Sequence, residues 1–198
     1  MAIARLFAER STRSDSEVLA ELEAFEPLPE ESSVEWSSDS AGAWIRARLF
    51  VALADAAAVR KLRGAAPMLL ERACFGDPGE MMRDLRHSLE AIFKPDWAAL
   101  TKVCVDASSS KTAGARLWAV DELGVLRSPE STWSLIARLE DEQPEIRSYA
   151  ARAVVRLCDA HPSLAESVVT GLKRASSRFR DAALTEALAK LNQSATAK

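Results

Sequence analysis

The sequence predicts an all-α fold in which four to five helical hairpins stack in series as a solenoid. The composition favours helix over sheet, because alanine is abundant and only 7 of the 198 residues are glycine. No alternating run of β-branched residues between turn residues indicates a strand. Apolar residues instead recur at helical spacing from residue 41 onward, and the helical segments repeat with a period of 31–36 residues.

The first 40 residues are much more acidic than the rest of the chain. They carry 3 basic and 10 acidic side chains, a net charge of −7, whereas residues 41–198 carry 23 basic and 19 acidic side chains, a net charge of +4. We therefore treat residues 1–40 as an acidic N-terminal extension. This extension is either a solvated tail or a segment that lies on a basic surface and competes with a ligand.

The extension is expected to contain one short helix and a linker. The helix spans residues 14–25 and can be capped by Ser14 or Ser16. Its apolar stripe, which would cover the first hairpin of the body, consists of Val18, Leu19, Leu22 and Phe25. Two prolines and five serines make residues 26–40 a linker. Trp36 in this linker either anchors it on the helices or contacts a partner.

Nine helices are expected in the body of the chain, joined by short turns that contain Pro, Ser or Asp. They cover residues 41–62, 66–75, 77–93, 94–107, 110–126, 128–141, 144–159, 162–175 and 177–191. Several of them begin with a proline in the first turn, namely Pro67, Pro95, Pro129 and Pro144. Each helix has an apolar stripe expected to face the core. The stripes include Ile45, Trp97 and Trp133, so we expect these side chains to be buried.

The first helices of successive hairpins share a sequence pattern. A shift of 31 residues places residues 115–126 on residues 146–157, so that Ala119 meets Ala150, and a further shift of 33 places Ala150 on Ala183. Small residues at one recurring position let neighbouring helices approach closely. A larger residue there would push the hairpins apart.

The second helices repeat as well. A shift of 36 places Trp97 on Trp133, but the next shift of 33 places Trp133 on Glu166, so the third unit is imperfect. One hairpin cannot bury its own apolar face, whereas stacked hairpins bury their faces in series. The paired periodicity therefore predicts an α-solenoid.

The turn before the helix at 144–159 has the sequence "DEQPEIR", residues 141–147. Asp141 can accept hydrogen bonds from backbone N–H groups at the start of that helix. Arg147 lies one turn later and can pair with Asp141 or its neighbours. Such a pair, if partly buried, fixes the angle between hairpins more than it adds stability.

This order of Asp, Pro, an apolar residue, Arg, alanines and a Leu/Val stripe resembles a HEAT repeat, in particular the short bacterial HEAT-like repeats. The resemblance is clearest over residues 112–191 and extends back to residue 77. It implies a right-handed α-α superhelix, which we expect over residues 41–193, and a bacterial protein. Residues 194–198 are expected to be a disordered tail.

HEAT-like proteins bind other macromolecules, and the resemblance implies that the concave face lined by second helices is the binding surface. A non-enzymatic protein-binding scaffold or adaptor is therefore expected, whose partner is another protein with an acidic patch. The expected partner-binding residues are Arg138, Thr170, Lys173, Arg174, Arg178, Arg180 and Trp36.

Two other functions are kept as alternatives. The chain could be an inhibitor or immunity protein that neutralises a toxin or an enzyme, in which case the acidic extension would mimic nucleic acid. It could also be a nucleic-acid-binding protein similar to the HEAT-like glycosylases that remove alkylated bases from DNA. A sequence pI of about 5.6 argues against a nucleic-acid partner.

The sequence offers no catalytic, cofactor or metal site. Its two histidines, His87 and His161, are followed by Ser88 and Pro162, so the His-Glu pairs that bind iron in HEAT-like hydroxylases are missing. No nucleophile and base can be paired from these residues. We therefore expect a protein that is not an enzyme and needs no cofactor.

The cysteines and the hydropathy pattern predict a cytoplasmic protein. Cys74, Cys104 and Cys158 are odd in number, far apart and set among apolar helical residues, which is typical of reduced core cysteines. No stretch approaches the roughly 20 apolar residues of a membrane span. The apolar run near the N-terminus is too short for a signal peptide.

Overall fold

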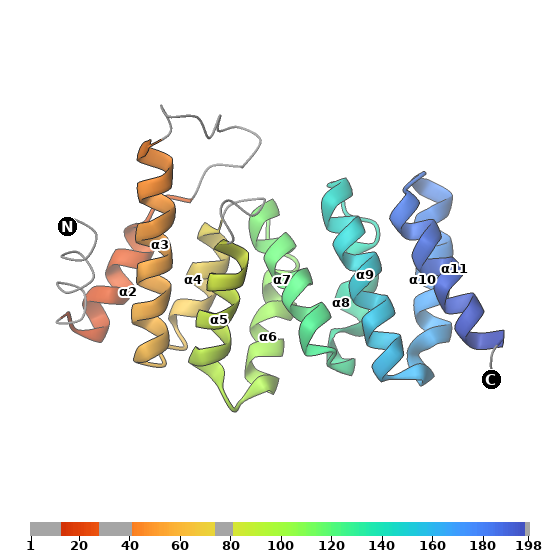
Figure 1. Cartoon of the computed structure of the whole chain (residues 1–198), viewed down its shortest axis with the longest axis horizontal. Helices are drawn as coiled ribbons and strands as arrows, with labels where there is room; N and C mark the ends of the chain where they lie inside the picture. Colours follow the sequence, from red (N-terminus) through yellow and green to blue (C-terminus); the bar gives the residue numbers. More distant parts are fainter. Residues whose placement is uncertain (1–12, 28–40, 74–80, 197–198) are drawn as a thin grey trace. The chain divides into compact units, whose positions relative to one another are not determined.

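A computed structural model of the chain describes residues 13–27, 41–73 and 81–196 (Figure 1). These residues form ten α-helices and no β-strand, which confirms the predicted all-α class. Trp36 and Cys74 lie outside the described residues. Within the described ranges, no helix combines the length and the apolar character needed to cross a membrane. The chain divides into two compact units, Met1–Val103 and Cys104–Lys198, and each is described by itself.

The N-terminal unit contains α2 (Asp15–Ala24), α3 (Ala41–Val59), α4 (Ala65–Arg72), α5 (Met81–Phe93) and the beginning of α6 (Trp97–Ala107). Helix α2 begins as predicted, because Ser14 and Glu17 form a capping box. The Glu17 backbone N–H donates to the Ser14 hydroxyl at 3.4 Å, and the Ser14 backbone N–H donates to the Glu17 carboxylate at 2.6 Å.

Helix α2 packs on α3 and α4, as its apolar stripe predicts. Val18 and Leu22 are fully buried, and the rings of Phe25 and Phe50 lie 5.5 Å apart. Arg72 of α4 donates to the Phe25 carbonyl at 2.8 Å, so that the end of α2 is also held by a hydrogen bond. Helix α2 therefore covers the first helices of the body.

Helix α3 turns a different side to the core than the sequence suggests. Ile45, expected in the apolar stripe, is 52% exposed, and the buried face runs instead through Ala47, Phe50, Ala54 and Ala57. The prediction was wrong because α3 is apolar on nearly every side, so periodicity does not select one face. The bulky residues of α5 decide the orientation, since α5 is the main neighbour of α3.

The C-terminal unit contains the end of α6 and five further α-helices, with short 3₁₀ turns before two of them. They are α7 (Ala113–Leu126), η4 (Pro129–Ser131), α8 (Thr132–Arg138), α9 (Pro144–Ala160), η5 (Pro162–Leu164), α10 (Ala165–Arg178) and α11 (Ala182–Thr196). Helix α9 contacts both α7 and α11, while α8 and α10 contact each other (Figure 1). The first helices of the hairpins thus form one layer and the second helices another.

Small residues occupy the places where these helices approach most closely. Ala119 and Ala150 are fully buried, as expected, whereas Ala183 is half-buried. A Cβ added to Gly124 of α7 would lie 2.9 Å from the Cβ of Ala153 of α9. The backbones of α7 and α9 are therefore in contact through residues that have almost no side chain.

The two tryptophans expected in the core are not buried there. Trp133 is 72% exposed and Trp97 is 41% exposed. One continuous helix was expected over residues 128–141, but a 3₁₀ turn precedes α8, and the buried side of α8 runs through Leu135 and Ile136. Trp133 points away from that side.

Two further expectations concern the cysteines and the end of α11. Cys104 and Cys158 are free and buried, which confirms their assignment as reduced core residues. Burial raises the pKa of the Cys158 thiol to about 11 and also raises that of Cys104. A disordered tail was predicted over residues 194–198, but helix α11 continues to Thr196.

Substituting Gly124 by Ala should destabilise the fold by about 1–3 kcal/mol, because α7 and α9 must separate to admit the methyl group. The free energy of unfolding in urea measures this loss. Gly42→Ala is the matched control, since nothing lies within 4 Å of an added Cβ there and alanine is the better helix former. Equal stability of Gly124→Ala and the wild type would contradict the close helix contact.

Candidate functional site

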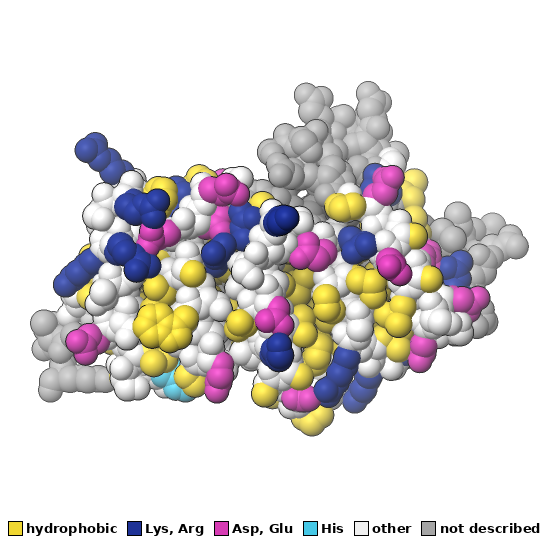
Figure 2. Space-filling model, turned by 180° about the vertical axis from the view of Figure 1, so that it is seen from behind, with side chains coloured by type: hydrophobic (Ala, Val, Ile, Leu, Met, Phe, Trp, Pro, Cys, Tyr) yellow, Lys and Arg dark blue, Asp and Glu magenta, His cyan; other side chains and the backbone are white. Residues whose placement is uncertain are grey.

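The exposed side of the second helices, here called the α8–α10 face, is the surface on which three of the expected binding residues lie, namely Thr170, Lys173 and Arg174. Its residues are Trp133 and Ala137 of α8 and Glu166, Thr170, Lys173, Arg174 and Ser177 of α10. Helical periodicity places them there, because Leu135, Ile136, Val168 and Leu172 are buried on the opposite side of the same helices. The space-filling view from behind shows apolar patches among side chains of both charges (Figure 2).

The structure brings some of the predicted residues together and separates others. Arg174 and Arg178 of α10 meet at one carboxylate, that of Glu140, which follows α8. Arg138 is directed to a different carboxylate, that of Asp141. Arg180 lies in the turn before α11 and is exposed, with no ion pair to a described residue. The predicted basic cluster is thus not one continuous patch.

Glu140 forms ion pairs with two of the predicted binding residues. Arg174 Nε donates to Glu140 Oε1, and Arg178 Nη1 donates to Oε2 of the same carboxylate. Partial burial on its own raises the pKa of Glu140, but the hydrogen bonds from Arg174 and Arg178 outweigh this effect and hold the pKa below its usual value of 4.5. Glu140 therefore joins the end of α8 to the last turns of α10.

Asp141 is a buried carboxylate with several donors. Arg116 of α7 donates to both of its oxygens, from Nε at 2.9 Å and from Nη2 at 3.0 Å. Arg138 Nη1 donates at 3.0 Å, and the Gln143 backbone N–H donates at 3.1 Å. The last bond confirms the predicted contact with the start of α9. One donor of Arg138 is therefore engaged within the fold, while its side chain stays 24% exposed.

Arg147 makes the contact that the sequence only partly predicts. It donates from Nη1 to the backbone carbonyls of Asp141 and Glu142, at 2.8 and 3.1 Å, and its Nε donates to the carboxylate of Asp181 in the next turn. The Asp141 carboxylate is not available to Arg147, because Arg116 occupies it. Arg147 therefore links the turn before α9 to the turn before α11.

Arg116 repeats this arrangement one hairpin earlier, and sequence reasoning did not identify its role. Its Nη1 donates to the carbonyls of Ser110 and Lys111, each at 3.1 Å, while its carboxylate partner lies in the following turn. The signal was present in the repeat, since a shift of 31 residues places Arg116 on Arg147. Each arginine thus binds the turn before its own helix and an aspartate in the turn before the next first helix.

Few groups on the α8–α10 face remain available to a partner. Lys173 is exposed and has no hydrogen bond or ion pair with any described residue. The Thr170 hydroxyl donates to the Glu166 carbonyl of its own helix at 2.9 Å, so only its remaining lone pairs face solvent. The indole of Trp133 is the largest exposed apolar group of this unit among the described residues.

The exposure of Trp133 could have been deduced from the repeat. The shift that aligns the second helices places Trp133 on Glu166, a charged residue that is also exposed. A position that accepts glutamate in one hairpin faces solvent in the next. The mismatch that made the third unit look imperfect therefore marked the surface position.

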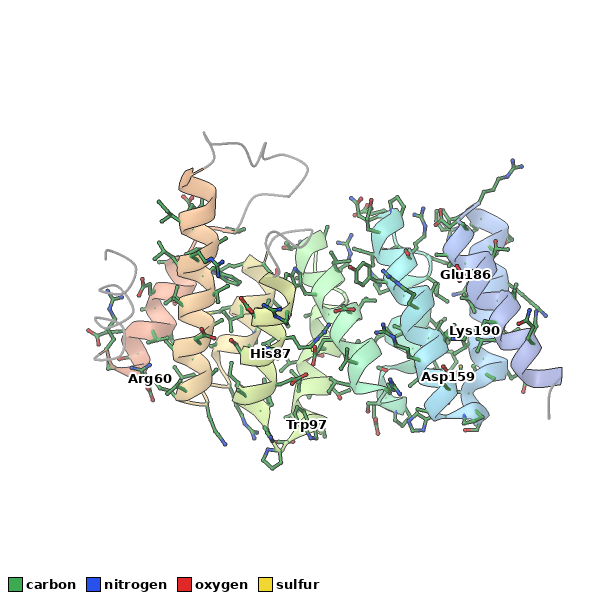
Figure 3. The ribbon with its side chains drawn as sticks, viewed as in Figure 1. Arg60, His87, Trp97, Asp159, Glu186 and Lys190 are labelled. Atoms are coloured by element: carbon green, nitrogen blue, oxygen red, sulfur yellow. The ribbon has the colours of Figure 1, made fainter. Side chains whose placement is uncertain are left out.

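The histidines do not form a metal or catalytic centre in the described part of the chain. His161 Nε2 lies 2.9 Å from the Arg127 carbonyl and thus links the turn after α9 to the turn after α7, while His87 of α5 is exposed (Figure 3). Residues 13–27, 41–73 and 81–196 contain no group of three His, Cys, Asp or Glu side chains that could hold a metal ion. Comparison of the chain with protein-family models, with the curated proteins and with the solved structures gives no match.

Substituting Asp141 by Ala should destabilise the fold by about 3–5 kcal/mol, because the buried guanidinium of Arg116 loses its partner. Equilibrium unfolding in urea measures the change. Glu142→Ala removes a mostly exposed carboxylate from the same guanidinium, and its effect should stay below about 1 kcal/mol. Similar losses in the two variants would show that Asp141 has no special role.

Glu140 should make the stability of the fold depend on pH in the acid range. Its pKa is lowered in the folded state, so its contribution is present at neutral pH and is lost as the pH falls below the usual carboxyl value of about 4.5. The variant Glu140→Gln lacks this contribution at every pH. Melting temperatures of the two proteins should differ at pH 7 and converge on acidification, and a constant difference would refute the assignment.

Proposed function

We propose that this chain is a non-enzymatic scaffold or adaptor that binds another protein through the α8–α10 face. In this proposal residues 41–193 form a right-handed HEAT-like solenoid and residues 1–40 an acidic extension. The two helix layers of the C-terminal unit and the recurring contacts of Arg116 and Arg147 support it, because both are expected when similar hairpins stack. The free, buried thiols of Cys104 and Cys158 support a cytoplasmic location.

The observation that carries the proposal is the 72% exposure of Trp133. Tryptophan is enriched among the residues that contribute most to protein–protein binding, because it offers a large apolar area with few rotatable bonds. Trp133 stands on a helix whose opposite side is packed through Leu135 and Ile136. The indole is therefore presented from a fixed backbone, which lowers the ordering cost of binding.

The available charges describe the partner surface in more detail. Arg138, Arg174 and Arg178 each form an ion pair with a carboxylate of the chain itself, so the face is less basic than its count of arginines suggests. Lys173 and Glu166 remain exposed on α10. A fitting partner has an apolar pocket for the indole of Trp133 and an acidic group opposite Lys173.

Replacing Trp133 by Ala should weaken binding to such a partner by about 2 kcal/mol, or about thirtyfold in Kd. The partner is first captured on the immobilised chain and identified, and the affinities of the purified proteins are then measured by calorimetry. Val59→Ala, which shortens an exposed apolar side chain of the other unit, should not change the affinity. Unchanged binding by Trp133→Ala would rule out the α8–α10 face as the contact surface.

A further inference from the structure

A cleft of about 390 Å³ lies between α9 and α11, in the layer of first helices and not on the α8–α10 face. Its floor is apolar and consists of short side chains, those of Ala151, Val155, Ala183 and Ala187. Charged side chains of both helices form its rim. A volume of this size falls in the range of ligand-binding pockets, roughly 300–1,000 Å³.

The repeat explains why a cleft opens here and not between α7 and α9. Gly124 and Ala153 let α7 and α9 touch. Shifts of 31 and 33 residues place these two positions on Val155 of α9 and Glu186 of α11, which both line the cleft. A valine and a glutamate hold the helices apart where a glycine and an alanine close the other pair.

Cations outnumber carboxylates on the rim. Arg156 is exposed and forms no hydrogen bond or ion pair with the described residues, and the guanidinium of Arg152 lies 4.2 Å from the ring centre of Tyr149. Stacking on a ring leaves the N–H donors of an arginine directed outward. Arg152 and Arg156 are four residues apart, so they lie side by side on α9.

Helix α11 contributes one charge of each sign to the rim. Lys190 and Glu186 lie on its side toward α9, and Lys190 Nζ is 4.0 Å from Asp159 Oδ2 of α9 (Figure 3). That contact lies at the surface, where both side chains are exposed. The rim thus combines three cations with one carboxylate, above a floor that can take apolar groups.

We propose that the α9–α11 cleft binds a short acidic and apolar segment of a partner protein. Carboxylates of the segment would accept hydrogen bonds from Arg152 and Arg156, a pairing that the planar guanidinium favours. Apolar side chains of the segment would lie on the alanines of the floor. This inference rests on the proposed function, that of a protein-binding scaffold, and assigns it a second contact surface with a different chemistry.

The test uses a short, fluorescently labelled peptide of Glu and Leu in a helical pattern, with a Lys and Leu peptide of the same pattern as comparison. The full chain should bind the acidic peptide and not the basic one, as measured by fluorescence anisotropy. Backbone amide NMR shifts should change in α9 and α11. Failure of the acidic peptide to bind, or equal binding of both peptides, would overturn the proposal.

Two variants test the rim and the floor separately. Arg156→Glu should lower the affinity at least tenfold, and Ala183→Leu should do the same by filling the cleft. Arg48→Glu makes the same change of charge at an exposed arginine of α3, outside the cleft, and should have little effect. Thermal unfolding checks that each variant is folded. An equal loss in Arg48→Glu would show that net charge, and not the cleft, attracts the peptide.

Trp133→Ala separates this inference from the proposed function. It should leave peptide binding unchanged, because Trp133 does not line the cleft. If Trp133→Ala weakens binding of the partner protein while the peptide never binds, the scaffold function stands and the cleft proposal fails. If the peptide binds in the cleft while Trp133→Ala binds the partner protein with unchanged affinity, the α8–α10 face is refuted as the contact surface instead.

Discussion

Two buried arginines determine how the helices of the C-terminal unit are arranged. A guanidinium removed from water is tolerated only where its donors are engaged, and each of these arginines meets that condition in the same way. Arg116 binds the carbonyls of the preceding turn and the carboxylate of Asp141, and Arg147 does the same with its own preceding turn and Asp181. Since each contact joins three segments of chain, the spacing of one hairpin from the next follows from the geometry of a single side chain.

The same requirement decides which cations can serve binding. Arg138 shares the carboxylate of Asp141 with Arg116, and Arg174 and Arg178 share that of Glu140, so these positive charges are partly offset within the fold. Lys173 is left to the outer surface of α10. A count of basic residues along the sequence cannot make this distinction, because it depends on carboxylates that reach the same place from other turns.

Much of the fold can be predicted from the sequence, and the predictions that were wrong failed for physical reasons. The helices, the cap at Ser14 and the contact of Asp141 with the start of α9 were predictable, because each depends on residues close together in the chain. The orientation of α3 was not, since an almost wholly apolar helix has no preferred side until α5 packs on it, and Ile45 was therefore misassigned. In the candidate site, Trp133 was taken for a core residue because it belongs to an apolar stripe and recurs with Trp97 at one position of the repeat. Its alignment with Glu166 was the better guide.

The recurrence of one contact at both ends of a hairpin restricts how the chain can change its length. Asp141 and Asp181 each receive the arginine of the preceding first helix. Removal of residues 141–180 would bring Asp181 to Arg116, and duplication of the same block would give every arginine a carboxylate. A deletion that removes an aspartate but keeps its arginine leaves a guanidinium stranded in the interior. Changes of length that involve these turns are therefore expected to add or remove an arginine and an aspartate together.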